Sequence, residues 1–343
     1  MTVALPASRI ADPAQAPALR WGVLGPGRIA EAFATSLRAH TRQVLAAVGS
    51  RNAARGAVFA ERHGIPAVHG AYEDLVADPA VDVVYIATPN PFHARCALLA
   101  IEAGKHVVVE KPFAMDADEA QRVAEAAASR GVFAMEAMWP RFLPATDVIR
   151  QVLGAGSIGD IHAVSADLGE YFAPDPTSRL FDPALGGGAL LDLGVYLVSF
   201  ASFALGGLER AAPERVIAAG SLTETGVDAQ VSIVLQGEGH RHAHLFTTLE
   251  ARTPTSAFVT GTRGVLEVHA PFYLPSAITV TPHGGDAATV RFAQHRPEDA
   301  LCFEAAEAAR QIADGRTESP LMPLAETVRI MRTLDAVRAE LGP

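Results

Sequence analysis

The feature that most constrains this fold is an alternation, from Arg20 onward, of short apolar runs with amphipathic segments. The apolar runs at 21–25, 44–50, 81–88, 105–110 and 132–138 are typical of buried strands. Between the first two, Ile29, Phe33 and Leu37 recur at four-residue spacing, as on one face of a helix. Strands that alternate with helices form βαβ units, so this part of the chain is predicted to be an α/β domain with a parallel sheet.

The pattern changes after Trp139. Apolar residues at every second position from Val227 to Leu235 indicate a sheet with one apolar face. Further strands are expected at 243–249, 256–260, 264–268 and 277–281, and helices at 299–314 and 324–341. A chain of 343 residues normally forms two domains. We therefore predict a flexible tail at 1–18, a domain with a parallel sheet at 19–140, and an α/β domain with an open, mainly antiparallel sheet at 141–343.

Composition narrows the function. The formal charge is −10, from 28 Lys plus Arg and 38 Asp plus Glu, and no basic block stands out, which argues against a nucleic-acid partner. Cys96 and Cys302 are far apart, so neither a disulfide framework nor a zinc site is indicated and a reducing cytoplasm is expected. Pro and charged residues interrupt the N-terminal segment, and no run approaches 18 uncharged apolar residues, so no membrane association is expected.

The first strand runs into a glycine loop. Gly25, Gly27 and Ala30 form G-x-G-x-x-A between a predicted strand and a predicted helix. Small residues there permit a tight turn, a close approach of the backbone to a pyrophosphate, and close packing of helix on strand. The alternative is a purely structural turn. The loop predicts a dinucleotide site that includes Arg28 and Ile29.

The end of the second strand bears on which dinucleotide is bound. NAD-specific sites usually place a carboxylate about 20 residues after the loop, but this strand ends in Ser50 and Arg51, with Arg55 one turn later. Guanidinium groups suit the 2′-phosphate of NADP. The alternative is that both arginines only solvate the start of an outer helix. The sequence therefore favours NADP(H).

A second candidate site follows the strand at 105–110. Glu110, Lys111 and Pro112 stand at its carboxyl end, where open α/β sheets bind ligands. A solvated lysine at the start of a loop is the alternative.

These motifs together resemble one family. The segments GVLGPGRIA, ATPNPFHARCALLAIEAGKHVVVEKPFA and GGGALLDLGVY resemble the glucose-fructose oxidoreductase (Gfo/Idh/MocA) family, over almost the whole chain after residue 20. The stretches at 136–144 and 179–196 look most like its dimeric dihydrodiol dehydrogenase and NADP-dependent D-xylose dehydrogenase branch. The resemblance implies a Rossmann domain followed by an α/β domain whose open sheet forms a homodimer interface.

The resemblance also implies residue roles. Lys111 and Tyr196 would be catalytic, with Asp192 beside them in the substrate pocket, and Tyr196 stands where many members carry His. The cofactor side would be lined by Thr88, Asn90, His93 and Glu110. A cis Lys111–Pro112 bond is also implied.

The implied reaction is NADP-dependent hydride transfer to or from a hydroxyl or carbonyl carbon of a sugar, such as D-xylose, or of a cyclic vicinal diol. Tyr196 would be the general acid or base and Lys111 would lower the pKa of its phenol. Substrate contacts are expected from Trp139, Arg141, Phe172, Arg179 and Phe181, although Trp139 and Arg141 could equally be a packing tryptophan and a surface arginine. A keto-sugar reductase and a non-catalytic NADP-binding regulator are the alternatives.

One further pattern invites a metal interpretation. His240, His242 and His244 alternate along a predicted strand. A solvated sheet face explains them better, because no supporting carboxylate is evident, and no metal is expected.

Overall fold

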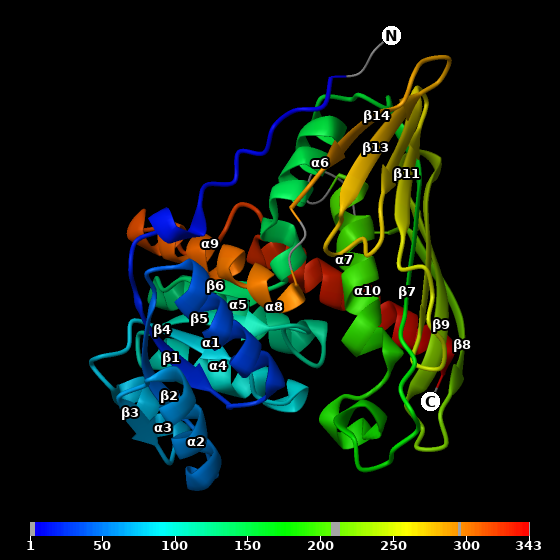
Figure 1. The fold of residues 1–343 in the computed structure, drawn as a ribbon. Helices are drawn as coiled ribbons and strands as arrows, with labels where there is room; N and C mark the ends of the chain where they lie inside the picture. The colour runs from blue at the N-terminus through cyan, green and yellow to red at the C-terminus, as the bar shows by residue number, and fades with distance from the viewer. Residues whose placement is uncertain (1–3, 207–212, 294–295, 343) are drawn as a thin grey trace. The chain divides into compact units, whose positions relative to one another are not determined.

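The computed structural model describes residues 4–206, 213–293 and 296–342 (Figure 1). The chain divides into two compact units. One comprises Ala11–Phe142 and His295–Val328, and the other Met1–Ile10, Leu143–Gln294 and Arg329–Pro343. The segment 295–328, which the sequence assigns to the second domain, thus groups with the first.

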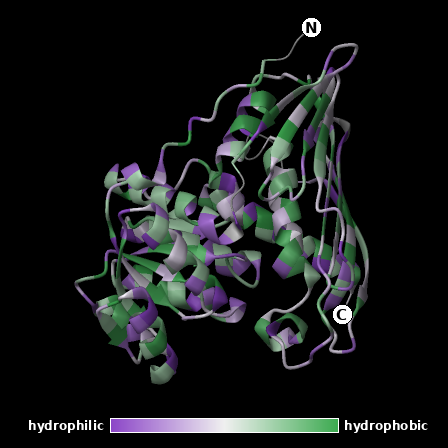
Figure 2. Cartoon of the chain, in the orientation of Figure 1, coloured by the Kyte–Doolittle hydropathy of each residue, from purple (hydrophilic) through white to green (hydrophobic). Residues whose placement is uncertain are grey.

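The first unit is built on a six-stranded parallel sheet. Its strand order is β3-β2-β1-β4-β5-β6, the doubly wound order of Rossmann folds, which confirms the predicted fold class. The strands are β1 (Arg20–Leu24), β2 (Val44–Gly49), β3 (Ala67–His69), β4 (Val83–Ile86), β5 (His106–Glu110) and β6 (Ala134–Ala137). Only the short β3 lies outside the apolar runs expected from the sequence. Figure 2 shows the central strands of this sheet as predominantly hydrophobic.

Helices connect and cover these strands. They are α1 (Arg28–His40), α2 (Ala53–His63), α3 (Tyr72–Ala77), α4 (His93–Glu102), α5 (Ala117–Arg130), α8 (Pro297–Ala300) and α9 (Cys302–Ala313). An aromatic cluster fastens α1 to the sheet: the ring of Phe33 stacks on Tyr85 at 3.7 Å between centroids and contacts Trp21 edge-on. Ser36 of α1 donates to the carbonyl of Asp299, and the amide of Cys302 donates back to Ser36. These bonds explain why residues 295–328 belong with this unit.

The second unit is built on an eight-stranded sheet of order β14-β13-β12-β11-β7-β10-β9-β8, in which only β7 and β10 pair in parallel. The strands are β7 (Ile161–Gly169), β8 (Arg215–Leu222), β9 (Asp228–Gly237), β10 (Arg241–Thr248), β11 (Ala257–Gly261), β12 (Gly264–Val268), β13 (Ala277–Pro282) and β14 (Ala288–Arg291). The mainly antiparallel sheet is as predicted. Strands β7, β8 and β14 were not predicted, because β7 alternates imperfectly and β8 is exposed along most of its length.

Helices cover one face of this sheet. These are α6 (Pro144–Gly154), α7 (Val195–Ala204) and the later part of α10 (Leu324–Leu341), with α7 packed on β7 and β10. The stretch Pro183–Ala204, which contains α7, is long and apolar enough to cross a membrane by composition, but 72% of its most apolar window is buried in the protein. That burial is typical of a core helix.

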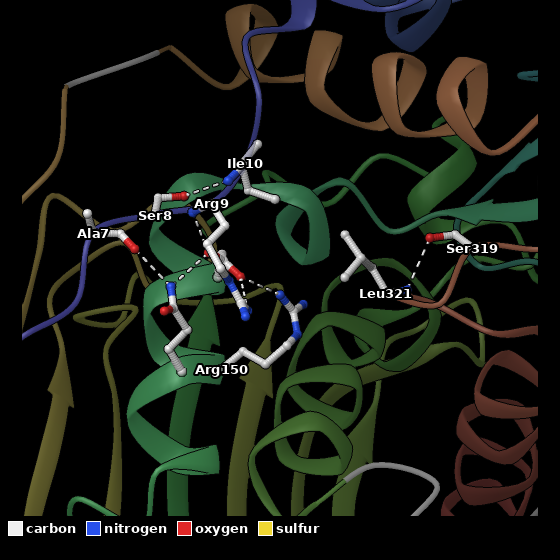
Figure 3. Close-up of polar contacts among 9 residues, drawn as sticks. Ala7, Ser8, Arg9, Ile10, Arg150, Ser319 and Leu321 are labelled. Carbon is white, nitrogen blue, oxygen red and sulfur yellow. Dashed lines mark hydrogen bonds and ion pairs between the residues drawn. The ribbon is translucent and has the colours of Figure 1, made fainter. Parts of the chain in front are cut away.

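The N-terminal segment differs from the flexible tail expected at 1–18. Arg9 donates through its backbone amide and its guanidinium to Asp147 of α6, each at 2.7 Å, and Gln151 donates to the carbonyl of Ala7 (Figure 3). In the other unit a 3₁₀ turn spans Pro13–Gln15, and Ala16 is fully buried against α9. The segment lacks regular periodicity, so these long-range contacts could not be predicted from its pattern.

Candidate functional site

The glycine loop forms the turn between β1 and α1. Gly25 has φ = +85°, and a Cβ there would lie 2.9 Å from the carbonyl oxygen of Ala87. Both the left-handed backbone and the close approach require glycine at this position. The turn therefore brings the start of α1 against the end of β4.

Gly27 occupies a different environment. It is the N-cap of α1, no side chain caps the helix there, and a Cβ on it would meet no described atom within 4 Å. Arg28 and Ile29 open the helix, and Ala30 is fully buried beneath them. An uncapped helix start with open space in front suits a phosphate, because its first amides and the helix dipole both favour an anion. The loop thus fits the pyrophosphate of a dinucleotide.

The end of β2 presents the predicted arginines. Ser50 is buried, and its hydroxyl is engaged within the turn, where it donates to the carbonyl of Asn52. Arg51 is exposed, with its guanidinium carbon 5.1 Å from the centre of the Phe92 ring. Arg55 is also exposed, in the first turn of α2. This strand end therefore offers two guanidinium groups, whereas the hydroxyl of Ser50 stabilises the turn.

The ends of β4 and β5 are tied together by a histidine. His93 is buried, with Nε2 2.7 Å from the carbonyl oxygen of Thr88 and Nδ1 2.8 Å from that of Pro112. Thr88 and Asn90 are buried beside it, and the Lys111–Pro112 bond is cis, as the resemblance implied. His93 therefore positions the two loops that carry the predicted cofactor and catalytic residues.

Glu110 points into the first unit. The hydroxyl of Tyr85 donates to its Oε1, and the backbone amide of Lys111 donates to its Oε2 at 3.2 Å. Two more glutamates are buried in the same unit: burial raises the pKa of Glu136 to about 7 and that of Glu304 well above its usual range. The carboxylate of Glu110 therefore supports the loop from beneath, next to the backbone of Lys111.

Trp139 and Arg141 lie just after β6. Both are buried, and the guanidinium of Arg141 forms an ion pair with Glu326 at 3.0 Å. Because this pair is almost fully withdrawn from water, removing one partner would leave an uncompensated charge. The contact fits a structural role for Arg141 better than the predicted role in binding substrate hydroxyls.

In the second unit, the glycine run at 186–188 precedes the segment that carries Asp192 and Tyr196. Gly188 has φ = +112°, and a Cβ on it would overlap Oδ1 of Asp228. The other oxygen of Asp228 accepts a hydrogen bond from the amide of Leu190 at 2.6 Å. Burial raises the pKa of Asp228 to about 6. The glycine run thus makes room for a carboxylate of the chain itself.

The segment that follows exposes little except its two polar residues. A π-helical turn spans Leu190–Gly194 and leads into α7. From Ala189 to Phe200 every residue is buried except Asp192 and Tyr196, which are partly accessible. Four residues apart on helical backbone, they emerge on one face. The structure therefore presents this carboxylate and this phenol on the same side of the segment.

Arg179 contacts Asp192, and Tyr273 contacts Tyr196. Arg179 donates to Oδ1 of Asp192 at 2.7 Å. The ring of Tyr196 lies 5.9 Å from that of Tyr273, whose pKa is raised by burial and by the nearby Glu170. Sequence reasoning missed Tyr273 and Asp228, because each is brought here by sheet topology from a segment without a motif. Phe172 is partly buried and Phe181 buried, and no described contact joins either ring to Tyr196.

His242 and His244 lie on β10, which begins directly after His240. The rings of His242 and His244 stack 6.2 Å apart, while the side chain of His240 lies outside the described residues. Within the described part of the chain, no three His, Cys, Asp or Glu side chains are grouped to hold a metal ion.

Comparison with known proteins agrees with this architecture. Residues 19–138 match the family described as "Oxidoreductase family, NAD-binding Rossmann fold", and residues 147–267 match the "GFO/IDH/MocA C-terminal domain". The chain is 37% identical over 331 residues to mouse (Mus musculus) trans-1,2-dihydrobenzene-1,2-diol dehydrogenase, covering 95% of this chain and 97% of that protein.

Solved structures are similar in the same way. A 3-ketoreductase from Actinomadura kijaniata, KijD10, crystallised with NADP and TDP-benzene, is 27% identical with a TM-score of 0.82, covering 95% of this chain and 98% of its own. A levoglucosan dehydrogenase in complex with NADH, 22% identical, shares the fold with a TM-score of 0.85 over 94% and 97% of the two chains. The chain is therefore an oxidoreductase and belongs to the Gfo/Idh/MocA family.

Proposed function

We propose that this protein transfers a hydride between NADP and a hydroxyl or carbonyl carbon of a sugar or a cyclic vicinal diol, with Tyr196 as general acid or base. The observation that carries the proposal is the partial accessibility of Asp192 and Tyr196 on an otherwise buried helical segment. A polar side chain on a core helix costs stability unless it has a partner. The packing of this helix therefore gives no reason for a phenol and a carboxylate side by side. A proton relay supplies that reason.

Each side chain has a part in this mechanism. When bound, the nicotinamide supplies the hydride chemistry, so the protein must orient the substrate and move a proton. Tyr196 takes the proton from a substrate hydroxyl during oxidation and returns it during reduction. Lys111 is given the role that the family resemblance implies for it, lowering the pKa of this phenol, because a positive charge near a phenol favours its charged form.

Asp192 and Arg179 orient the substrate. The guanidinium of Arg179 donates a charge-assisted hydrogen bond to Oδ1 of Asp192, and this bond holds the carboxylate in one orientation. Nη1 of Arg179 is buried without a hydrogen-bond partner among the described residues, so it is a donor for a substrate oxygen. The ring of Tyr273 adds an apolar surface beside Tyr196.

Replacement of one tyrosine tests the mechanism. We expect Tyr196→Phe to lower kcat by about 10²-fold or more, the usual effect of losing a general acid or base, with unchanged affinity for NADPH. Tyr171→Phe, on an exposed tyrosine of the same unit, is the matched control and should leave kcat unchanged. Equal turnover by Tyr196→Phe and wild type would remove Tyr196 from the mechanism.

The preference for NADP over NAD rests on the end of β2. Arg51 and Arg55 are both exposed there, and β2 runs into Ser50 and Arg51 rather than into a carboxylate. The Actinomadura relative was crystallised with NADP and the levoglucosan dehydrogenase with NADH, so both dinucleotides occur on this fold. Kd values for NADPH and NADH, in wild type and Arg51→Gln, test the proposal. Equal values in the wild type would contradict it.

The substrate class follows from the relatives. The mouse relative is named for a dihydrodiol, and the Actinomadura relative for 3-keto reduction, which also favours reduction of a keto-sugar as a second candidate. A panel of dihydrodiols, pentoses, hexoses and keto-sugars, followed by NADPH absorbance in both directions, separates these candidates. Tight NADPH binding with no turnover of any of them would favour the non-catalytic regulator.

A homodimer through the open face of the eight-stranded sheet is also proposed. Ile217, Val234 and Phe258 lie in one row across this face, through the register of β8, β9, β10, β7 and β11. Ile217 and Phe258 are 40% and 42% exposed, so an interface on this face would remove apolar surface from water. Light scattering on wild type and Phe258→Glu tests the proposal: we expect a dimer that the variant weakens, and a monomeric wild type would contradict it.

The cytoplasmic location expected from the sequence remains a proposal. Cys96 and Cys302 are both free and buried, an arrangement compatible with a reducing compartment. Fractionation of the source cells, with immunodetection of the protein, tests it, and recovery in an exported fraction would contradict it.

A further inference from the structure

The loop that carries Lys111 is held through its backbone by three buried side chains of the first unit. Glu110 accepts a hydrogen bond from the amide of Lys111 at 3.2 Å, and Nδ1 of His93 lies 2.8 Å from the carbonyl oxygen of the next residue. The amide of Phe113, which follows, donates to Oε1 of Glu136 at 3.2 Å. Each of three consecutive loop residues is therefore fixed by a different side chain.

Glu136 also ties this loop to the first turn of α10, which belongs to the same unit. Its Oε2 accepts a hydrogen bond at 3.0 Å from the hydroxyl of Thr327, and both residues are fully buried. The ion pair of Arg141 with Glu326, also at 3.0 Å, joins the same turn to the segment just after β6. The carboxylate of Glu136 therefore cannot turn away from Phe113 without losing its bond to α10.

A carboxylate is an unusual side chain for this position. The other residues of β6, Ala134, Met135 and Ala137, are apolar and fully buried. Burial raises the pKa of Glu136 to about 7, although its hydrogen-bond donors and the nearby Arg141 act in the opposite direction. An apolar side chain would fill this interior position without that cost. The carboxylate therefore indicates a requirement for its two acceptor atoms.

We propose that Glu136 is a positioning residue for the reaction, because its bond to the amide of Phe113 holds the loop in the conformation in which Lys111 assists Tyr196. This inference rests on the proposed function. Without the acceptor, the buried amide of Phe113 is left unsatisfied, and the loop shifts toward another partner. A displacement of about 1 Å in an active site can lower the rate by about 10²-fold, so the effect should fall on kcat.

Two substitutions of Glu136 test this role as a pair. Leucine is similar in size but removes both acceptors, so Glu136→Leu should lower kcat at least about tenfold. Glutamine keeps both bonds, because its oxygen accepts from Phe113 and its amide group donates to the hydroxyl of Thr327, so Glu136→Gln should stay within about twofold of wild type. The assay follows NADPH absorbance with the substrate panel given above. A Glu136→Gln variant as slow as Glu136→Leu would overturn the proposal.

Glu307→Leu is the control for the loss of a buried carboxylate as such. Glu307 lies on α9 of the same unit and accepts hydrogen bonds from Ser319 at 2.6 Å and from Gln311 at 2.9 Å, neither of which belongs to the Lys111 loop. In every variant kcat is expressed per NADPH-binding site, counted by fluorescence titration, so that unfolded protein does not contribute. We expect wild-type kcat in Glu307→Leu. Equal kcat values for Glu307→Leu and Glu136→Leu would overturn the proposal.

Thr327→Val is a milder variant that keeps the test decisive if Glu136→Leu does not fold. Valine has the shape of threonine but no hydroxyl, so it releases the second oxygen of Glu136 and leaves the carboxylate in place. We expect kcat per NADPH-binding site to fall by about threefold or more, and Thr327→Ser, which retains the hydroxyl, to match wild type. Wild-type kcat in Thr327→Val would overturn the proposal.

Amide hydrogen exchange separates this inference from the proposed function, because it needs no substrate. Mass spectrometry of fragments that span Phe113 should show its amide exchanging at least about tenfold faster in Glu136→Leu than in wild type or Glu136→Gln. Unchanged exchange, or wild-type kcat in Glu136→Leu, would overturn the role of Glu136 alone. A wild type that turns over no substrate of the panel would overturn the proposed function, and the role of Glu136 with it.

Discussion

Two helical segments of this protein begin after glycines, one in each unit, and they use those glycines in opposite ways. At the start of α1, Gly27 leaves space in front of an uncapped helix. Before the π-helical turn, Gly188 gives its space to Asp228, which accepts a hydrogen bond from the amide of Leu190. The first helix start is open to a ligand anion, and the second is already closed by a carboxylate of the chain.

The difference explains why the two glycine motifs have different functions. An open helix start binds phosphate through its amides. A closed start cannot, and the role proposed for this segment belongs instead to the side chains one turn later, Asp192 and Tyr196. Glycines before a helix therefore indicate an anion site only where the space in front of the helix is empty of protein atoms.

The largest expected effect comes from adding a methyl group at the closed start. Gly188→Ala should lower the free energy of unfolding by about 3 kcal/mol or more, because it combines left-handed strain with overlap on Asp228. Gly64→Ala is the control: Gly64 also has positive φ, at +68°, but a Cβ there meets nothing within 4 Å, so about 1–2 kcal/mol is expected. Urea unfolding measures both, and equal losses would show that Asp228 does not occupy the space.

The second prediction concerns pH. Burial raises the pKa of Asp228 from about 3.8 to about 6, so the folded state holds this proton more tightly than the unfolded state. Its contribution to stability is therefore fully present below the unfolded pKa and is lost as pH rises through 6. Relative to Asp228→Asn, wild type should lose on the order of 2–3 kcal/mol between pH 4 and pH 7. A constant difference between the two proteins across that range would contradict the closed start.

The smallest effect is expected at the open start. Gly27→Ala should lower the free energy of unfolding of the ligand-free protein by only about 0.5–1 kcal/mol, the loss expected when alanine replaces a favoured N-cap residue, because the backbone there is extended and a Cβ meets no described atom. The measurement is urea unfolding without dinucleotide. A loss as large as that of Gly188→Ala would mean that the space in front of α1 is filled.

Much of the first unit could be predicted from the sequence, because each long strand is an uninterrupted apolar run and the residues of the glycine loop are contiguous. The same holds for the helical spacing of Asp192 and Tyr196. Strands β7 and β8 could not be predicted, since their burial depends on neighbours far away in the chain. Asp228 and Tyr273 reach the site through strand register and loop packing, for which a single sequence carries no local signal.

Two charged side chains show the same limit. The segment at 4–18 has no periodicity, yet Arg9 finds a buried carboxylate on α6. Arg141 has the right chemistry for a substrate hydroxyl, but Glu326, 185 residues later, takes its guanidinium. Partners at long sequence separation decide the roles of these charged side chains.

Titration of NADPH into the Gly27→Val variant tests the central claim most directly. If the start of α1 is the pyrophosphate site, the branched side chain fills the ligand's space, so the Kd of NADPH should rise at least about tenfold, while the ligand-free protein stays folded and loses only about 1 kcal/mol of stability, the cost of a poor N-cap residue. Tyr196→Phe, measured alongside, should bind NADPH as wild type does. Wild-type affinity in Gly27→Val, or a ligand-free variant that unfolds, would contradict the account of an open and a closed helix start.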